Sequence, residues 1–369
     1  MKCLVKSVTL AVLLLLVLAG VSAAKENPVI SDLEMIISQG QPATFEKFAQ
    51  IKNNIEKNPG EILPLLLAKA NAPDLPDESL AVYIWALGMT GEPEAVEEII
   101  KLTQGKKNEM LQQNAYRSLA MIGGDKAAEY LFRRLQQTSE PKARHYLFDL
   151  LAQLQYLPAL PAAFEILQQD PKTLYWQSVF IFGKYGDAAV PFLLSKINDS
   201  NRNVQANAIM VLGQWLIARE AREPLKKQFQ VESDPNIRAL ILSSLERITS
   251  NVDDIRTFSE EILKTEKDEN VTQFAFETIS NFEEMKKHIA SFKAGKKDDR
   301  SGFESAYKEI YDSLGKTGDY QLLAEASTRA DEARLKKLKE VILQRNENDC
   351  FHDYQKINDV IMLNRLSQS

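Results

Sequence analysis

The chain is poor in the residues that most often bind metals or form disulfides. It has only two cysteines and three histidines among 369 residues. Cys3 lies in a leader-like segment, so Cys350 alone remains after it and no intramolecular disulfide is expected. His145, His288 and His352 are far apart, and none belongs to a His-Glu pair or to HExxH spacing. The sequence therefore predicts no metal site.

Signatures of nucleotide binding and hydrolysis are missing as well. There is no GxSxG elbow, no Walker loop and no dinucleotide fingerprint. The Gly183-Lys184-Tyr185-Gly186 segment is explained by a helix C-cap, because the same phrase recurs at 315–318. Paired acids such as Glu97-Glu98 fall on predicted polar helix faces, where they are solvated. We predict no catalytic residue and no cofactor, which favours a non-enzymatic protein.

The segment 1–24 is typical of a secretory signal peptide. Lys2 and Lys6 precede an apolar run over 8–21, and small residues follow it at 22–24. The run is shorter than the roughly 20 residues of a spanning helix, although an uncleaved anchor is the alternative. Val21 stands where a lipoprotein would need cysteine. We expect cleavage, a periplasmic or secreted location, and no stable membrane insertion of the mature chain.

The charge balance disfavours nucleic acid as a partner. The full chain has 45 basic and 51 acidic residues, for a net charge of −6. Removal of the leader takes two basic residues away, so the mature charge is 43 − 51 = −8. Its short lysine groups, such as 296–297 and 336–339, are interleaved with acids. An acidic chain without a basic cluster repels a phosphate backbone.

A short glycine turn recurs at a regular interval. Its second glycine falls at positions 91, 124, 186 and 318, so the gaps are 33, 62 and 132. These gaps are close to one, two and four units of a period near 32. A fixed period of this size indicates a stacked repeat protein, in which each unit contacts its neighbours.

Each repeat has the apolar pattern of two helices. The second helix opens with an apolar anchor, at Leu111, Ala143, Leu174, Val204, Ile237 and Val271. After one of these anchors, Val204, the apolar residues follow at i+4, i+7 and i+8, on one helical face. No alternation of period two recurs, so strands are not expected. An acidic residue or serine next to proline, as at 139–141, 170–171 and 234–235, predicts the N-terminus of a second helix.

These signals predict an all-α, right-handed α-solenoid of about nine helix pairs with flanking capping helices. The pairs are expected to begin near residues 59, 92, 125, 158, 187, 219, 253, 284 and 319. Lone helices are expected at 43–57 and 351–366. The predicted domains are a signal peptide (1–24), a solenoid (25–290), a charged loop or hinge (291–302) and C-terminal helical repeats with a cap (303–369).

The segment Asp234-Pro235-Asn236-Ile237-Arg238, with Leu212-Gly213 in the neighbouring unit, resembles a HEAT repeat. It is most similar to the short form found in phycobilisome-lyase-type proteins, over about residues 59–345. Other units replace the arginine, as Gln205 and Tyr175 do. The resemblance implies the fold and an interaction role with many kinds of partner. The iron-binding His-Glu pairs of one class of HEAT enzyme are absent, and so are the tetratricopeptide and ankyrin phrases.

The second helices of such solenoids commonly line the concave binding side. The residues just after the anchors form a polar column there, which contains Arg144, Tyr175, Gln205 and Arg238. Arginine and tyrosine are enriched at binding hot spots. We therefore predict partner contact at Tyr116, Arg144, Tyr175, Gln205 and Arg238. The alternative is a solvated ladder, or an Asp–Arg ladder between repeats. Trp176 and Trp215 are predicted to lie in the core.

The sequence favours an exported, non-enzymatic HEAT-like scaffold or adaptor that binds another protein along its concave helical surface. One alternative is an enzyme or lyase-like chaperone with a small-molecule pocket between repeats. Another is a glycan-binding module of the envelope that uses Tyr116, Tyr175 and Trp176. A protein partner is expected in the first case, and nucleic acid in none of them.

Overall fold

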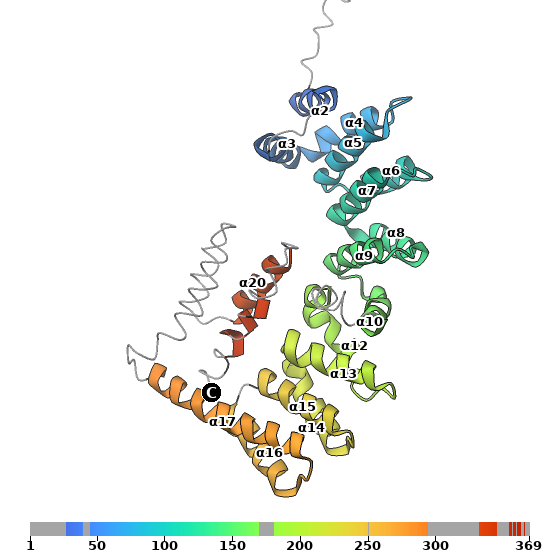
Figure 1. Cartoon of the computed structure of the whole chain (residues 1–369). Coiled ribbons are helices and arrows are strands. Elements are labelled where there is room, and N and C mark those ends of the chain that lie inside the picture. Colours follow the sequence, from blue (N-terminus) through green and yellow to red (C-terminus); the bar gives the residue numbers. More distant parts are fainter. Residues whose placement is uncertain are drawn as a thin grey trace, which may run out of the picture. The chain divides into compact units, whose positions relative to one another are not determined.

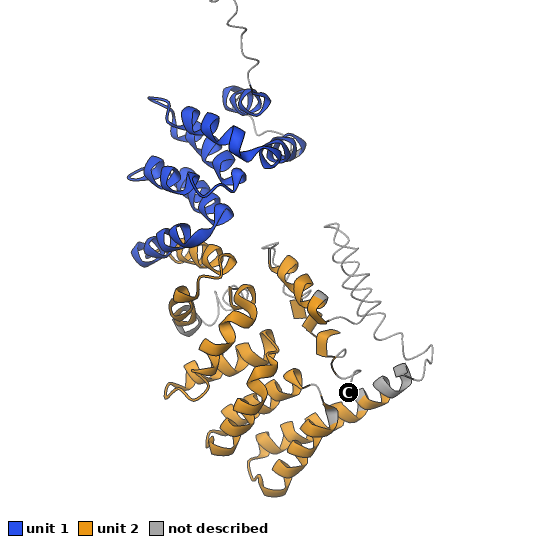
Figure 2. Cartoon of the chain, turned by 180° about the vertical axis from the view of Figure 1, so that it is seen from behind, with its two compact units in different colours: residues 1–139 blue, residues 140–369 orange. Residues whose placement is uncertain are grey.

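A computed structural model describes residues 27–39, 45–169, 181–249, 251–293 and 332–344, and eight positions between 354 and 365. All regular structure in these ranges is helical, as the periodicity predicts. The signal peptide, the segment 294–302 of the hinge and most of the region 303–369 lie outside the described residues. The chain divides into two compact units, residues 1–139 and 140–369 (Figure 2).

The described part of unit 1 contains seven helices (Figure 1). They are α2 (Pro28–Gln39), α3 (Phe45–Lys57), α4 (Pro59–Ala70), α5 (Asp77–Thr90), α6 (Ala95–Thr103), α7 (Glu109–Ile122) and α8 (Gly124–Gln137). The pairs α4/α5 and α6/α7 begin within three residues of the expected starts at 59 and 92, and α3 matches the lone helix expected at 43–57. The helix α2 has no counterpart in the sequence prediction.

Unit 2 continues the pattern with shorter and less regular first helices. Its elements are α9 (Pro141–Gln153), η1 (Leu157–Ala159), α10 (Leu160–Gln169), η2 (Gly186–Ala189), α12 (Val190–Leu194), α13 (Arg202–Met210), η3 (Val211–Trp215), η4 (Arg219–Ala221), α14 (Arg222–Val231), α15 (Pro235–Ile248), α16 (Val252–Thr265), α17 (Glu269–Lys293) and α20 (Glu332–Gln344). The boundary between the units falls after α8, inside the third predicted pair.

One expected boundary is wrong. The helix α17 runs without a break from Glu269 to Lys293, so no repeat begins near residue 284. The apolar positions Val271, Ala275 and Phe282 are buried along it, and no glycine or proline interrupts this stretch. A helix that keeps a buried face and meets no breaking residue continues.

The helix ends follow the predicted chemistry in part. Gly91 ends α5 in the left-handed conformation, with φ of +66°, which a Cβ would disfavour. Asp234 caps α15, because its side chain accepts a hydrogen bond of 2.9 Å from the Asn236 N–H. The acid after this glycine turn, Glu92, does not cap the next helix. α6 begins at Ala95, and no side chain accepts a capping hydrogen bond at its N-cap, Glu94.

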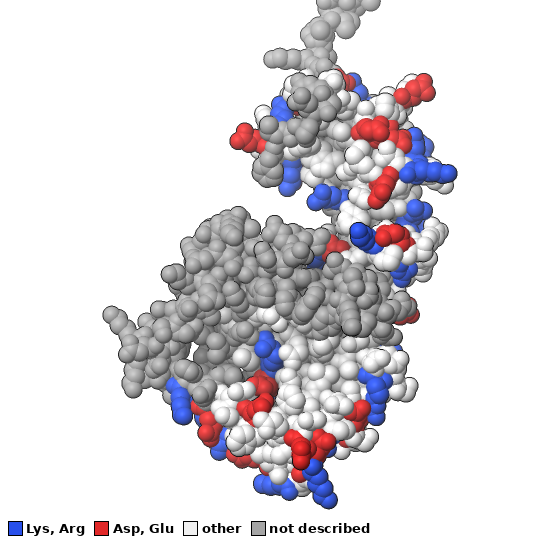
Figure 3. Space-filling model, viewed as in Figure 1, with Lys and Arg blue, Asp and Glu red and all other residues white. Residues whose placement is uncertain are grey.

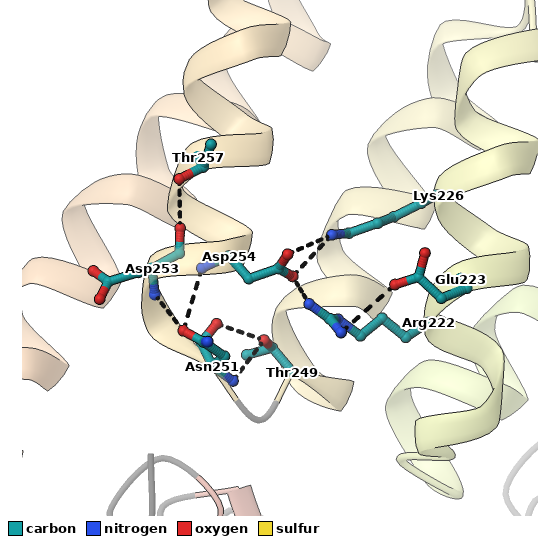
Figure 4. Close-up of polar contacts among 8 residues, drawn as sticks. All are labelled: Arg222, Glu223, Lys226, Thr249, Asn251, Asp253, Asp254 and Thr257. Atoms are coloured by element: carbon teal, nitrogen blue, oxygen red, sulfur yellow. Dashed lines mark hydrogen bonds and ion pairs between the residues drawn. The ribbon is translucent and has the colours of Figure 1, made fainter.

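Ion pairs join successive first helices. Asp254 of α16 accepts hydrogen bonds of 3.0 and 2.8 Å from the Nζ of Lys226 in α14, and also pairs with Arg222 (Figure 4). Asn251 caps the start of α16 beside this cluster, which fixes the position of Asp254. Lys126 of α8 pairs in the same manner with Glu97 of α6. These charges therefore have structural partners in the adjacent repeat.

The structure offers no candidate for a membrane-crossing helix within the residues it describes. None of the helices there combines the length and the apolar character that a bilayer requires.

Candidate functional site

A row of side chains on α7 faces outward from the second helices of unit 1. Met110, Asn114, Arg117 and Met121 follow i, i+4, i+7 and i+11 spacing, which places them on one face of the helix. Met110 is 47% exposed and Met121 is 38% exposed. Arg117 is exposed between them and forms no ion pair with any residue that the structure describes. The row is thus apolar at both ends and cationic in the middle.

The preceding second helix, α5, carries the equivalent row one repeat earlier. Trp85 and Met89 occupy the positions of Arg117 and Met121, and both are half-buried. Equivalent positions of successive repeats face the same side of a solenoid. Phe48 of α3 packs edge-to-face on Trp85, with ring centroids 5.1 Å apart, so α3 borders this side.

We call Trp85, Met89, Met110, Arg117 and Met121 the second-helix surface of unit 1. Methionine side chains adapt to irregular partners, and large exposed apolar residues grouped together mark interaction sites. The basic and acidic side chains are interspersed on the face seen in Figure 3, and they do not gather by sign among the described residues of that face.

Arg144, Gln205 and Arg238 of the predicted column lie on the later second helices α9, α13 and α15, and two of them connect repeats. Gln205 is 1% exposed, and its Nε2 donates a 2.7 Å hydrogen bond to Glu232 Oε2 at the end of the next first helix. Arg238 forms the corresponding ion pair with Glu266, at 2.5 Å, one repeat later. These contacts join successive repeats, as an Asp–Arg ladder would, but the acid is a glutamate at both places and Gln205 replaces one arginine. Partner binding at both residues stays a prediction.

Glu232 is the most strongly hydrogen-bonded acid of this ladder. Burial alone would raise its pKa, but it accepts hydrogen bonds from the Asp234 N–H and from Gln205, Gln228 and Arg202. These bonds stabilise the charged form and lower the pKa of Glu232 to about 2. The carboxylate is therefore a structural link between repeats and stays ionised at neutral pH.

The remaining predicted residues are dispersed. Tyr116 is 9% exposed, and its hydroxyl accepts a 2.9 Å hydrogen bond from the Nε of Arg134 in α8. Arg144 is half-buried, with its guanidinium 5.8 Å from the Phe148 ring centroid. Tyr175 lies outside the described residues, as does Trp176. Trp215 is 4% exposed, which confirms its predicted place in the core.

The paired acids Glu97 and Glu98 do not have the raised pKa of a general acid. Lys126 lowers the pKa of Glu97, and Lys101 lowers the pKa of Glu98, so both carboxyls remain ionised. Burial lowers the pKa of His145, which favours the neutral imidazole. Within the described ranges, no three His, Cys, Asp or Glu side chains are grouped so as to hold a metal ion.

Sequence reasoning missed the second-helix surface of unit 1, although a signal for it exists. Trp85 and Arg117 are separated by one repeat period, and so are Met89 and Met121. Gln205 and Arg238, just after their anchors, meet the following repeat, whereas the α7 positions three, six and ten after the anchor Leu111 lie on the outward row. A large residue that recurs at those offsets is the pattern to search for.

Comparisons with known proteins agree with the repeat organisation. The family model for HEAT repeats matches residues 63–152, 160–246 and 190–280, together more than half of the chain. Among solved structures, the chain is similar to one described as the complex of CpcE and CpcF of phycocyanin lyase from Nostoc sp. PCC7120. That similarity has 13% identity and a TM-score of 0.31, and covers 70% of this chain and 97% of the other. No curated protein matches the sequence.

Proposed function

The chain belongs to the HEAT-repeat family, and we propose that it is an exported, non-enzymatic scaffold or adaptor that binds another protein along its second helices. The observation that carries this proposal is the second-helix surface of unit 1. It groups exposed methionines with a half-buried tryptophan and an exposed arginine. Aromatic residues, methionine and arginine are the types enriched at protein–protein interfaces.

The composition of this surface indicates the kind of partner. Met110 and Met121 offer apolar contact area, and Arg117 offers five N–H donors with no carboxylate beside it among the described residues. A partner segment with apolar side chains around an acidic residue satisfies both features. Apolar contacts around the pair between Arg117 and that acid would exclude water, which strengthens the attraction between the charges and removes part of their hydration.

Export is the second component of the proposal, and the leader-like sequence at 1–24 supports it. Cell fractionation and mass determination of the purified protein test it. We expect the protein outside the cytoplasm, with a mass that lacks the segment 1–24. A cytoplasmic protein that retains Met1 would contradict this component and leave the binding component standing.

Site-specific photo-crosslinking tests the binding component. A photoreactive phenylalanine derivative is placed at Met110 or Met121, and at the exposed Lys101 and Glu129 on first helices as controls. We expect one reproducible protein adduct from the two methionine positions and none from the controls. Equal adducts at all four positions, or none at the methionines, would contradict partner binding on the second helices.

The glycan alternative has no support of this kind. Tyr116, one of its three residues, is 9% exposed and is hydrogen-bonded to Arg134. The other two, Tyr175 and Trp176, lie outside the described residues.

A further inference from the structure

The C-terminal part of the chain packs onto the middle of unit 2. Helix α20, drawn in red in Figure 1, buries an apolar stripe, and the described positions 354–365 bury another. The buried apolar residues are Leu335, Leu338, Ile342, Leu343, Tyr354, Ile357, Val360 and Ile361. Hydrogen bonds and ion pairs join this part of the chain to residues 187–219, far earlier in the sequence.

The receiving surface is built by an unusual helix end. After α13 the chain continues as the π-helical turn η3, where the Leu216 N–H donates to the Val211 carbonyl at 2.9 Å. Ile217 then has φ of +46°, a conformation that a β-branched residue rarely adopts. This strained end turns the carbonyls of Trp215 and Ile217 toward the C-terminal segment. Strain of this kind is concentrated at functional sites.

Side-chain donors of the C-terminal segment satisfy these carbonyls. The Trp215 carbonyl accepts from the Tyr354 hydroxyl at 2.6 Å and from Asn358 Nδ2 at 3.0 Å. The Ile217 carbonyl accepts from the guanidinium of Arg365 at 2.9 Å. Tyr354, Asn358 and Arg365 follow i, i+4 and i+11 spacing, which places them on one face of a helix.

Shape and charge complete the contact. A Cβ on Gly183 would lie 3.2 Å from Leu343 and 3.4 Å from the Tyr354 hydroxyl, so even an alanine there would be tight against both side chains, and a larger residue would push them away. At the rim, Lys336 pairs with Asp187 at 2.9 Å. The surface therefore presents backbone acceptors, a glycine and an acid, which together fit a donor-rich apolar helix.

The contact is imperfect for a permanent core. Lys339 is buried, which lowers its pKa to about 7, and its Nζ reaches the Trp215 carbonyl only at 3.4 Å. Asn358 is fully buried, and its Oδ1 accepts no hydrogen bond from the described residues. Buried polar groups that are charged or unpaired oppose burial. An interface with this polar content resembles those that separate and reform.

We propose that the surface formed by Gly183, Gln214, Trp215 and Ile217 is a helix-binding site that α20 and the described positions between 354 and 365 occupy reversibly, in place of an amphipathic helix of a partner protein. The partner helix has an apolar stripe and carries hydroxyl, amide or guanidinium donors on the same face, as the segment 354–365 does. The proposal rests on the proposed protein-binding function and adds a second binding surface that is autoinhibited. A closed fraction of about 90% weakens the apparent affinity for the partner tenfold.

The first test requires no partner. Hydrogen–deuterium exchange is measured on the wild-type mature chain, with α20 compared with α13 and α15. If the segment opens by itself, the amides of α20 exchange at least about tenfold faster, relative to their intrinsic rates, than those of the two solenoid helices. Equal protection of α20, α13 and α15 would show that α20 is a permanent part of the core, and this result would overturn the proposal.

The second test uses a fluorescein-labelled peptide of residues 351–369 as the probe and follows its anisotropy. Arg365→Ala weakens the intramolecular contact and leaves the receiving surface intact, so the peptide should bind this variant about tenfold more tightly than wild type. Lys337→Ala, at an exposed position of α20, is the matched control and should behave as wild type. Gly183→Leu should abolish peptide binding.

Two results would overturn the proposal: equal binding of the peptide to wild type and to Arg365→Ala, or binding that survives Gly183→Leu. If Arg365→Ala loses helicity, Tyr354→Phe replaces it, since it removes a single hydroxyl. Dimerisation of the opened variant would identify a second copy of this chain as the occupant and overturn the assignment to a partner protein. The crosslinking test at Met110 and Met121 concerns unit 1, so its failure is distinguishable from failure here.

Discussion

Ser118 packs directly against Gly88. A Cβ on Gly88 would lie 2.6 Å from the Ser118 Cβ, and the Ser118 Oγ donates a 2.9 Å hydrogen bond to the Ile84 carbonyl. Gly213 and Ser244 repeat the arrangement in unit 2, where the Ser244 Oγ donates to the Ile209 carbonyl at 3.3 Å. The serine and glycine thus bring successive second helices into close backbone contact.

This contact predicts an inverted effect of a common substitution. Gly→Ala inside an α-helix normally stabilises by about 1 kcal/mol, because alanine has the higher helix propensity. At Gly88 and at Gly213 the added methyl group collides with a serine, so we expect each alanine variant to lose about 1–3 kcal/mol. Thermal unfolding followed by circular dichroism measures the change.

Gly60→Ala is the matched control. Gly60 also lies in a helix, α4, and no atom lies within 4 Å of the position that its Cβ would take. This variant should be as stable as wild type or more stable. If Gly60→Ala lost as much stability as Gly88→Ala, the loss at Gly88 would come from a change in the backbone and not from the contact with Ser118.

The fold could be predicted from the sequence because its signals are local. The apolar spacing after Val204 and the left-handed turn at Gly91 involve residues within one or two helical turns. The role of the first glycine in each turn was not visible in the same way. Gly88 ends no helix, and only the position of Ser118, on the following second helix, explains it.

The candidate sites depended on information that periodicity lacks. Periodicity separates the buried face of a helix from the rest, but it does not show which polar position meets the next repeat. Gln205 and Arg238 fall at the repeat junction, whereas Met121 and Arg117 remain outside it. The C-terminal contacts join residues such as Asp187 and Lys336, 149 positions apart, and no local pattern predicts them.

The hydrogen bonds of Glu232 predict an acid-sensitive repeat junction. Its pKa is about 2 in the folded chain and near 4.5 when exposed, so the folded state binds this proton more weakly. The carboxylate therefore contributes stability of about 3 kcal/mol above pH 4.5, and this contribution is lost as the pH falls toward 2. Glu232→Gln should lose stability at pH 7 and show a smaller further loss on acidification.

Urea unfolding at pH 7 and pH 3 measures this difference. Glu223→Gln is the control, because Glu223 lies on the same helix, α14, with its side chain 65% exposed. An exposed carboxyl contributes little, so this variant should follow wild type at both pH values. Equal losses from the two variants would mean that the bonds to Gln205 and Arg202 do not carry the effect.

Substitutions in the second-helix surface of unit 1 should reduce partner binding without changing the stability of the fold. Arg117→Glu combined with Met121→Glu changes two outward-facing side chains, so we expect the free energy of unfolding to change by less than about 0.5 kcal/mol. The same variant should lose the crosslinked adduct at Met110, because it places acids where the partner presents an acid. Retention of that adduct at wild-type yield would exclude a contribution of Arg117 and Met121 to binding.

Lys339 predicts the pH dependence of the C-terminal contact. Burial lowers its pKa to about 7, and the nearby charges of Lys336 and Arg365 act in the same direction, while Asp187 and Glu332 act against it. Burial raises the pKa of Tyr354, whose ring centroid lies 4.5 Å from the Lys339 Nζ, so that hydroxyl stays protonated. Lys339 is thus the group that titrates within this contact near neutral pH.

The open segment, with a lysine pKa near 10.5, binds more protons than the closed one between pH 7 and 10.5. Closure is therefore weakest at and below pH 7 and strengthens as the pH rises through this window. Lys339→Met replaces the buried lysine with an uncharged side chain of similar length. At pH 7, after correction for intrinsic rates, α20 should then be protected from hydrogen exchange at least about tenfold more than in wild type. The protection of α20 in this variant should no longer depend on pH. The advantage over wild type should shrink by pH 9. Lower protection of α20 in Lys339→Met at pH 7 would show instead that the charged lysine holds the segment closed.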